Sequence, residues 1–217
     1  GFVATALVKV REYFRGLKYK HLLSQLNVRK LYLFDVGTGD CRHFDYLTRN
    51  VEIECSGIEF QHSIVKQACD RGYNVIHGTM EKMDLDGHKS NYHIVSMNHV
   101  IEHVEDPRLV LEKSLSILKQ RGVLWGQTPS TDCWDLPLFG RYWGGIHYPR
   151  HLQIFSPGAL KNLLEELGYE EVRVYTAPHV QSALSFQNFL VSTCNIKSLK
   201  FGKVSFYSLL ILLALPF

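Results

Sequence analysis

The residues with the clearest chemical potential lie in one stretch, LYLFDVGTGDC, at residues 31–41. Its apolar beginning has the length of a buried strand, and Asp35 stands where that strand would end. The turn that follows contains Gly37, Thr38 and Gly39, and glycine permits positive φ angles and close approach of a ligand to the backbone. The N–H groups of such a turn, at the start of a helix, favour negative or polar ligand groups. An acid two residues before the first glycine suits a ligand that also carries a cationic amino group.

A dinucleotide-binding turn is the main alternative for this stretch. Such a turn reads GxGxxG, and its third glycine packs the helix against the strand. In this chain Arg42 stands at that third position. Arg42 and Asp35 therefore disfavour an NAD-dependent oxidoreductase. We keep this function as an alternative.

A second carboxylate supports a ligand that contains a ribose. Glu59 lies about twenty residues after the glycine turn, at the expected tip of the next strand. An acceptor at that position can bind both hydroxyls of a ribose. We therefore expect the glycine turn and Glu59 to hold the same ligand.

Short apolar strands alternate with helices along most of the chain. We expect strands at residues 30–36, 51–58, 73–77, 92–97, 122–128 and 171–176, and helices at residues 41–49, 61–71, 108–119 and 158–167. The first four alternations predict an α/β fold, a doubly wound, mainly parallel sheet with helices on both faces. The carboxyl ends of its strands would bring the glycine turn and Glu59 to one edge.

Two stretches carry a family resemblance. The glycine turn resembles motif I of class I S-adenosylmethionine-dependent methyltransferases, D/E-x-G-x-G-x-G, with Cys41 in place of the last glycine. The stretch YHIVSMNHVIEHVEDPRLVLEKSLSILKQRGVLWGQTPS, residues 92–130, is similar to the block around the fourth and fifth strands of that family. Gln120 and Arg121 depart from it, because proline and glycine are usual there. The resemblance covers residues 30–175, implies a Rossmann-like fold, and is closest to a subgroup of quinone-biosynthetic and other small-molecule methyltransferases.

The family resemblance implies how S-adenosylmethionine would bind. Asp35 would face its methionyl amino group, the backbone of Gly37–Gly39 would pass beside it, and Glu59 would hold its ribose. The family usually places an apolar residue and a polar or acidic neighbour against the adenine, which makes Met80 and Glu81 candidates, although Met80 could equally fill the core. The other cofactor-binding candidates are Phe60, Asn98 and His99.

The residues from His99 to His103 also spell HxxEH, the zinc motif of the inverted metalloproteases. That motif needs a helix, so that both histidines share one face, whereas here it directly follows an expected strand. Some quinone and RNA methyltransferases carry ExxEH at this place and hold a divalent ion with it, but His99 replaces the first acid in this chain. We predict a hydrogen-bond network beside the cofactor and no metal, with a divalent ion as the alternative.

The segment at residues 129–156 holds more aromatic residues than a connecting loop needs. Such a density either builds a satellite core or lines a pocket for an apolar ligand. Part of the segment resembles a substrate-side block of the same methyltransferase subgroup, and we expect it to cover the methyl donor as a lid. The substrate-binding residues that this resemblance implies are Trp143, His147 and Arg150.

A hydroxyl acceptor would need a general base, and histidine suits that role near neutral pH. The candidates are His103, His147 and His151. We favour His151 as the catalytic base because it lies in the substrate-side block, with His103 as the other catalytic candidate. Each of these histidines could instead be structural.

The two ends of the chain differ from the core at residues 30–176. Residues 1–29 form a basic, amphipathic helical segment, which could lie on an anionic membrane or cover a sheet edge. Residues 177–217 are expected to add a closing strand, antiparallel to the sheet, with residues 185–194 as its return arm. The apolar stretch at residues 204–217 is too short for a membrane span, which needs about twenty residues; a docking helix and an interfacial anchor are both open.

The bulk properties narrow the function further. The chain of 217 residues is 46% hydrophobic and 21% charged, as in soluble globular proteins. A net charge of +3 predicts no nucleic-acid partner, and five cysteines without a CxxC pair favour a reducing cytoplasm. We predict a cytoplasmic S-adenosylmethionine-dependent methyltransferase with a small, apolar acceptor, and peripheral membrane contact through either end of the chain as an open question. The alternatives are an NAD-dependent oxidoreductase and a catalytically silent cofactor-binding protein.

Overall fold

The structure is a computed structural model that describes residues 19–21, 23–176 and 181–194. Its chain divides into two compact units, residues 1–127 and 128–217. Residues 128–176, which the sequence groups with the core, therefore belong to the second unit. The basic segment before residue 19 and the apolar stretch at residues 204–217 lie outside the described residues.

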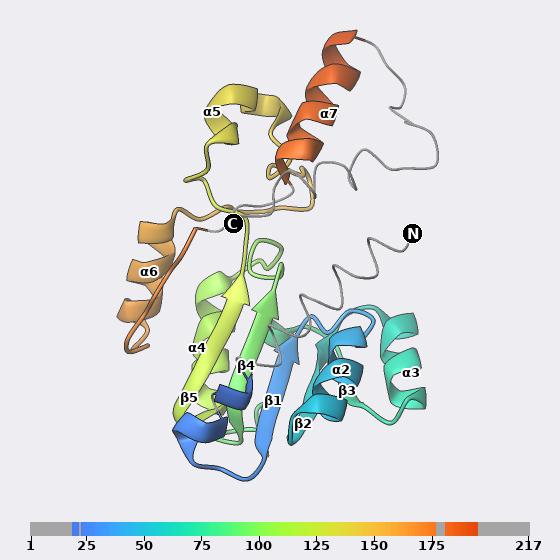
Figure 1. Ribbon diagram of the computed structural model, residues 1–217, viewed down its shortest axis with the longest axis vertical. Coiled ribbons are helices and arrows are strands. Elements are labelled where there is room, and N and C mark those ends of the chain that lie inside the picture. Colours follow the sequence, from blue (N-terminus) through green and yellow to red (C-terminus); the bar gives the residue numbers. More distant parts are fainter. Residues whose placement is uncertain (1–18, 22, 177–180, 195–217) are drawn as a thin grey trace. The chain divides into compact units, whose positions relative to one another are not determined.

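The first unit is built on a five-stranded sheet whose paired strands all run parallel (Figure 1). The strands are β1 (Leu31–Val36), β2 (Ile53–Glu59), β3 (Asn74–His77), β4 (Tyr92–Asn98) and β5 (Leu118–Gln127). Their spatial order is β3-β2-β1-β4-β5. The predicted parallel sheet of a Rossmann-like α/β fold is thus confirmed for the first five strands.

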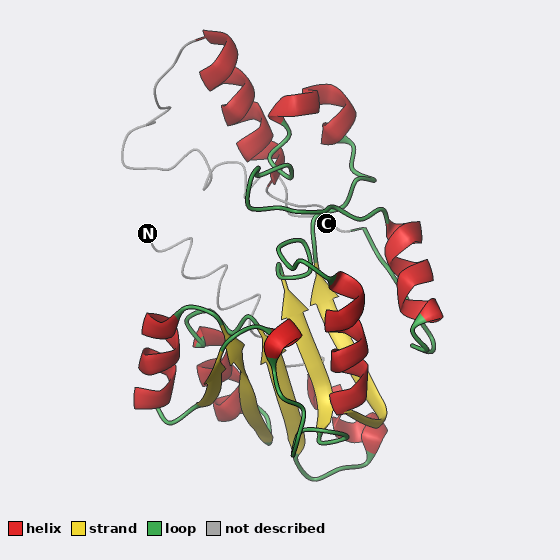
Figure 2. Cartoon of the chain, turned by 180° about the vertical axis from the view of Figure 1, so that it is seen from behind, coloured by secondary structure: helices red, strands yellow, loops and turns green. Residues whose placement is uncertain are grey.

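Helices cover both faces of this sheet, as the alternation predicts. The helices are α2 (Arg42–Asn50), α3 (His62–Asp70) and α4 (Pro107–Ile117), and the short 3-10 helix η1 (Met80–Lys82) follows β3. Side chains of α2 and α3 pack with β1 and β2 in one core cluster, whereas α4 covers the opposite face (Figure 2). The chain changes faces between β1 and β4, and α/β sheets bind ligands at the carboxyl ends of the strands at such a point.

The start of α4 follows its sequence signal. Pro107 occupies the first turn, and the Asp106 side chain accepts a hydrogen bond from the Leu109 N–H at 3.0 Å. This cap satisfies one of the N–H groups that the first turn leaves without a helical partner. The predicted beginning of the helix is therefore confirmed.

The second unit contains α5 (Asp135–Phe139), the 3-10 helix η2 (Gly140–Tyr142), α6 (Pro157–Glu166) and α7 (Gln181–Cys194). Two predicted strands are wrong. Residues 171–176 form no strand, and residues 185–194 belong to helix α7, so the described residues contain no antiparallel edge strand. The apolar side chains in α7 recur at helical spacing, and two of them pack on the Phe139 ring; they are Phe186 and Phe189.

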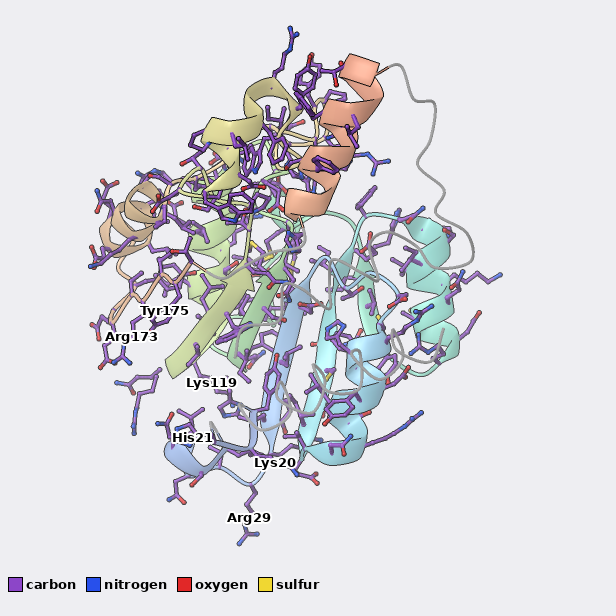
Figure 3. The ribbon with its side chains drawn as sticks, turned by 45° about the horizontal axis from the view of Figure 1, so that its top comes forward. Lys20, His21, Arg29, Lys119, Arg173 and Tyr175 are labelled. Carbon is purple, nitrogen blue, oxygen red and sulfur yellow. The ribbon has the colours of Figure 1, made fainter. Side chains whose placement is uncertain are left out.

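The amino end of the sheet carries a buried histidine in basic surroundings. Nδ1 of His93 accepts a hydrogen bond from the Tyr32 N–H at 3.0 Å, and the Lys119 ammonium lies 5.1 Å from the centre of the Tyr32 ring. Figure 3 shows Lys119 at the end of the sheet where Lys20 and Arg29 also lie. Burial, and then the Lys119 charge, lower the pKa of His93 below its ordinary value of 6.5.

The unfolded chain therefore binds a proton at His93 more readily than the folded chain does. Because the unfolded state gains the proton first, stability should fall as the pH drops below 6.5, by at most about 1.4 kcal/mol per pH unit. In His93→Asn the amide oxygen can replace Nδ1 as acceptor but cannot titrate, so part of this acid sensitivity should disappear. Urea unfolding at pH 7.5 and at pH 5.5 gives two free energies of unfolding for each protein, and their difference measures the acid sensitivity. His21→Asn, at an exposed position, should retain the sensitivity of the natural chain; equal pH dependence in His93→Asn would contradict the assignment.

Candidate cofactor-binding site

The glycine turn after β1 has the backbone conformation that its residue types predict. Gly37 and Gly39 have φ angles of +76° and +52°, and the Gly37 N–H donates to the Ile58 carbonyl at 2.8 Å. A Cβ atom at Gly39 would meet nothing within 4 Å, whereas one at Gly37 would lie 2.6 Å from a methyl carbon of Val100. The turn therefore packs against Val100 at Gly37, whereas the space beside Gly39 is open.

Glu59, at the tip of β2, is tied to this turn. Its side chain is buried, and its Oε2 accepts a hydrogen bond from the Gly39 N–H at 3.0 Å. The other oxygen, Oε1, accepts one from the Gln61 N–H at 3.0 Å. Each carboxylate oxygen has a second lone pair, so Glu59 can still accept hydrogen bonds from two hydroxyls of a ligand. The turn and Glu59 therefore lie at the same edge of the sheet, and the binding of a ribose by Glu59 stays a prediction.

Asp35 is also buried, and two side chains engage its carboxylate. The Ser96 hydroxyl donates to Oδ1, and Nε2 of His43 lies 3.1 Å from Oδ2. Despite this short distance Nε2 makes no hydrogen bond, and it is a buried polar atom without a hydrogen-bond partner among the described residues. Neither Ser96 nor His43 was singled out by the sequence. The contact of Asp35 with a methionyl amino group stays a prediction.

The loop after β3 holds the two predicted adenine-side residues. Met80 is buried, as a core filler would be. Glu81 is held in place because Nζ of Lys113 donates to its carbonyl at 2.6 Å and to the Met83 carbonyl at 2.8 Å. Phe60, next to Glu59, is 72% exposed. No contact in the structure tests whether these residues bind adenine.

The loop after β4 carries the HxxEH residues. β4 ends at Asn98, and His99 has a positive φ of 55°. Residues 101–103 form a turn and not a helix, so the motif lacks the geometry of the inverted metalloproteases. Nδ1 of His99 lies 3.2 Å from Oε1 of the fully buried Glu102, and a hydrogen-bond network beside the cofactor stays a prediction. His103 is exposed.

The aromatic segment in the second unit is a folded element with its own core. An isolated bridge joins Ser130 to Phe155 near its two ends. Trp143 is only 3% exposed, and its Nε1 donates to Oδ1 of the buried Asp135 at 3.2 Å. The Ser185 hydroxyl donates to the other Asp135 oxygen at 3.2 Å. The satellite core that the sequence offered as one alternative is therefore present, and Trp143 belongs to it.

His151 has a defined tautomer. Its Nδ1 lies 2.6 Å from the Gly145 carbonyl oxygen. Because a carbonyl can only accept, Nδ1 carries the proton, and the lone pair of the neutral ring is on Nε2. The His147 ring packs edge-on against the His151 ring, with 5.2 Å between centroids. His147 and Arg150 are exposed, and the roles of all three in acceptor binding stay predictions.

A family model described as a methyltransferase domain matches residues 10–174. The chain belongs to this family. It is a class I S-adenosylmethionine-dependent methyltransferase. The same match argues against the alternative function, an NAD-dependent oxidoreductase. No curated protein sequence matches the chain.

Many solved structures share the fold of this methyltransferase. A candidate sarcosine dimethylglycine methyltransferase from Galdieria sulphuraria matches with a TM-score of 0.60 and 17% identity, over 88% of this chain and 75% of the other. A possible histamine N-methyltransferase from Thermotoga maritima has a TM-score of 0.53 and 21% identity, over 76% and 78% of the two chains. The [4+2]-cyclase SpnF has a TM-score of 0.56 and 15% identity, over 82% and 69%. At these identities the likeness shows the fold alone.

The family implies S-adenosylmethionine as the methyl donor, and the site fits that molecule. The open side of Gly39 leaves room for a ligand against the backbone, and Glu59 offers carboxylate lone pairs beside it. Among the residues that the structure describes, no helix is long and apolar enough to cross a membrane.

Proposed function

We propose that this methyltransferase moves the methyl group of S-adenosylmethionine to a small, apolar acceptor. The observation that supports it most is the 3.0 Å hydrogen bond from the Gly39 N–H to Glu59 Oε2. It joins Glu59, the carboxylate proposed to bind the ribose, to the glycine turn at the carboxyl ends of β1 and β2. A ligand with a ribose and an amino-acid portion fits such a site.

The residues of the chain then need to bind and orient the methyl donor and the acceptor, and they do not need to activate the methyl group. When bound, S-adenosylmethionine supplies an activated methyl group on a sulfonium. The Gly37–Gly39 backbone and Glu59 would hold it, and Asp35 would face its amino group. The acceptor must approach in line, with the reacting atoms about 3–3.5 Å apart. Transfer would form a bond from the acceptor to the methyl carbon as the carbon–sulfur bond breaks. S-adenosylhomocysteine would leave, and a base of the chain would take the proton of the acceptor.

We propose acceptor recognition by the segment at residues 129–156. β5 ends at Gln127, so the chain leaves the sheet at the carboxyl edge where the glycine turn also lies. Large apolar side chains of the segment are exposed, and they suit an apolar or quinone-like acceptor; they are Trp134, Leu138, Tyr148 and Leu152. Arg150 and His147 are polar candidates on the same segment. The lid and the acceptor class are both part of this proposal.

His151 is the proposed base because its Nε2 holds the lone pair of the neutral ring. His151→Ala should lower turnover at neutral pH by about a hundredfold or more, while leaving the affinity for S-adenosylhomocysteine unchanged. Turnover of the natural enzyme should rise as His151 loses its proton, and the variant should lose that rise. His21→Ala, at an exposed position of the first unit, is the control. Equal pH–rate profiles for His151→Ala and the natural chain would remove His151 from this role.

The proposed function is tested by calorimetry followed by turnover. The protein should bind S-adenosylhomocysteine and should not bind NAD. Incubation with an extract and S-adenosylmethionine carrying an isotope-labelled methyl group should yield a labelled small molecule by mass spectrometry. Binding without any labelled product would favour the catalytically silent alternative. Membrane contact through residues 1–29 or 204–217, and a cytoplasmic location, are further proposals.

A further inference from the structure

Arg71, just after α3, reaches back to the glycine turn of the sheet's first strand. Its Nη1 donates to the Asp40 carbonyl at 2.6 Å, and its Nη2 lies 3.4 Å from the Cys41 carbonyl. The same Nη2 also donates to Oδ2 of Asp45 in α2. One guanidinium therefore contacts two consecutive carbonyls at the point where the turn becomes a helix.

The segment that Arg71 contacts has an unfavourable backbone conformation. Cys41 has φ +54° and ψ +18°, in the left-handed region that glycine adopts without a Cβ penalty. Its side chain is fully buried in the core cluster. Cys41 therefore holds a glycine-like conformation with a side chain packed in the core, and it needs compensating contacts.

A second layer of contacts holds Arg71 itself. The Arg71 guanidinium lies 5.3 Å from the centre of the Tyr73 ring, and the Tyr73 hydroxyl donates to Oδ1 of Asp45 at 2.7 Å. Burial alone would raise the pKa of Asp45, but the hydrogen bonds from Arg71 and Tyr73 hold it below its ordinary value. Asp45 is thus ionised near neutral pH and fixes the guanidinium toward the carbonyls.

We propose that Arg71 is a cofactor-positioning residue, which keeps the Asp40–Cys41 backbone in the conformation that presents the glycine turn to the methyl donor. Gly39, whose N–H meets Glu59, directly precedes the two clamped carbonyls. A shift of the Asp40 and Cys41 peptides would pass along the backbone to Gly39, and it would change the position of the Gly39 N–H and of the open side of the turn. Arg71 acts through the backbone and not by touching the ligand. This inference rests on the proposed cofactor site.

The test measures the affinity for S-adenosylhomocysteine by calorimetry and the melting temperature on the same full-length preparations. Arg71→Gln should weaken binding about tenfold. Arg71→Lys should give an intermediate loss, because one ammonium cannot span both carbonyls with a planar fork. Lys66→Gln is the control, since Lys66 is an exposed cation of α3. It should bind within about twofold of the natural chain.

A double variant separates positioning from a purely structural role. With Cys41→Gly the turn no longer needs compensation, so Arg71→Gln in that background should cost only about twofold in affinity. A lower melting temperature with unchanged affinity in Arg71→Gln would overturn the inference, as would an equal loss in both backgrounds. Glu59→Ala in the same assay tells the two proposals apart. If Glu59→Ala also binds normally, the cofactor site itself is wrong; if only Arg71→Gln binds normally, only this inference fails.

Discussion

Glu59→Ala should weaken binding of S-adenosylhomocysteine by about ten- to a hundredfold, because a lost charged hydrogen bond costs about 1.5–3 kcal/mol. The carboxylate accepts from the Gly39 and Gln61 N–H groups at 3.0 Å each. Alanine removes the ribose partner and also leaves these two N–H groups without their acceptor. Calorimetry at constant pH and salt measures the change.

Two further variants sharpen this result. Glu59→Gln keeps one carbonyl oxygen as acceptor, so its loss should be smaller than that of alanine. Glu54→Ala removes an exposed carboxylate of the same strand, one that pairs with Lys30 at 2.8 Å, and it should leave affinity unchanged. A folded Glu59→Ala protein that binds with natural affinity would contradict the site.

The glycine turn and the sheet could be predicted because their signals are local. Gly37 and Gly39 predict the turn because few residues other than glycine adopt positive φ angles. Asp35 marks the end of the strand before it. Short apolar runs that alternate with stretches of helical spacing predict the succession of strands and helices along the chain from β1 to β5. The placement of the glycine turn and Glu59 at one edge follows, because parallel strands end at one edge. The hydrogen bond from Gly39 to Glu59 itself is a finding of the structure.

The wrong strands show what local patterns leave out. Residues 171–176 alternate Val172 and Val174 with charged residues, as an edge strand does, but a strand also needs a neighbour to pair with. The stretch at residues 185–194 carries Phe186, Phe189 and Leu190 at helical spacing, which indicates the helix that the structure has. The aromatic residues at 129–156 gave no means of separating core from pocket, because both need large apolar side chains.

The supporting contacts of the site could not be predicted at all. Arg71 meets Asp40 across 31 positions of sequence, and Lys113 meets Glu81 across 32. Each is an ordinary basic residue at or after a helix, with no local sign of a partner. Such contacts depend on the packed fold, because the helices must first be placed on the sheet.

The largest effect on folding should come from Gly57→Ala in β2. A Cβ atom there would lie 2.3 Å from the Asp35 carbonyl oxygen and 2.4 Å from Cγ2 of Thr38. The oxygen is backbone in β1, which is paired with β2 on one side and β4 on the other, so it cannot move away cheaply. Overpacking of this kind costs about 3 kcal/mol, and thermal unfolding should occur about 6–12 °C lower.

A graded series distinguishes this clash from a general intolerance of alanine. Gly57→Val should lower the melting temperature more than Gly57→Ala does. Both changes should also weaken S-adenosylhomocysteine binding, because Thr38 lies in the glycine turn and Asp35 directly before it. Gly158→Ala is the matched control: it lies in helix α6 with nothing within 4 Å of the added carbon. Alanine should be neutral or stabilise there by about 0.5–1 kcal/mol, since glycine is the poorer helix former. A Gly57→Ala protein with the same melting temperature as the natural chain would contradict the close approach of β1 and β2 at Gly57.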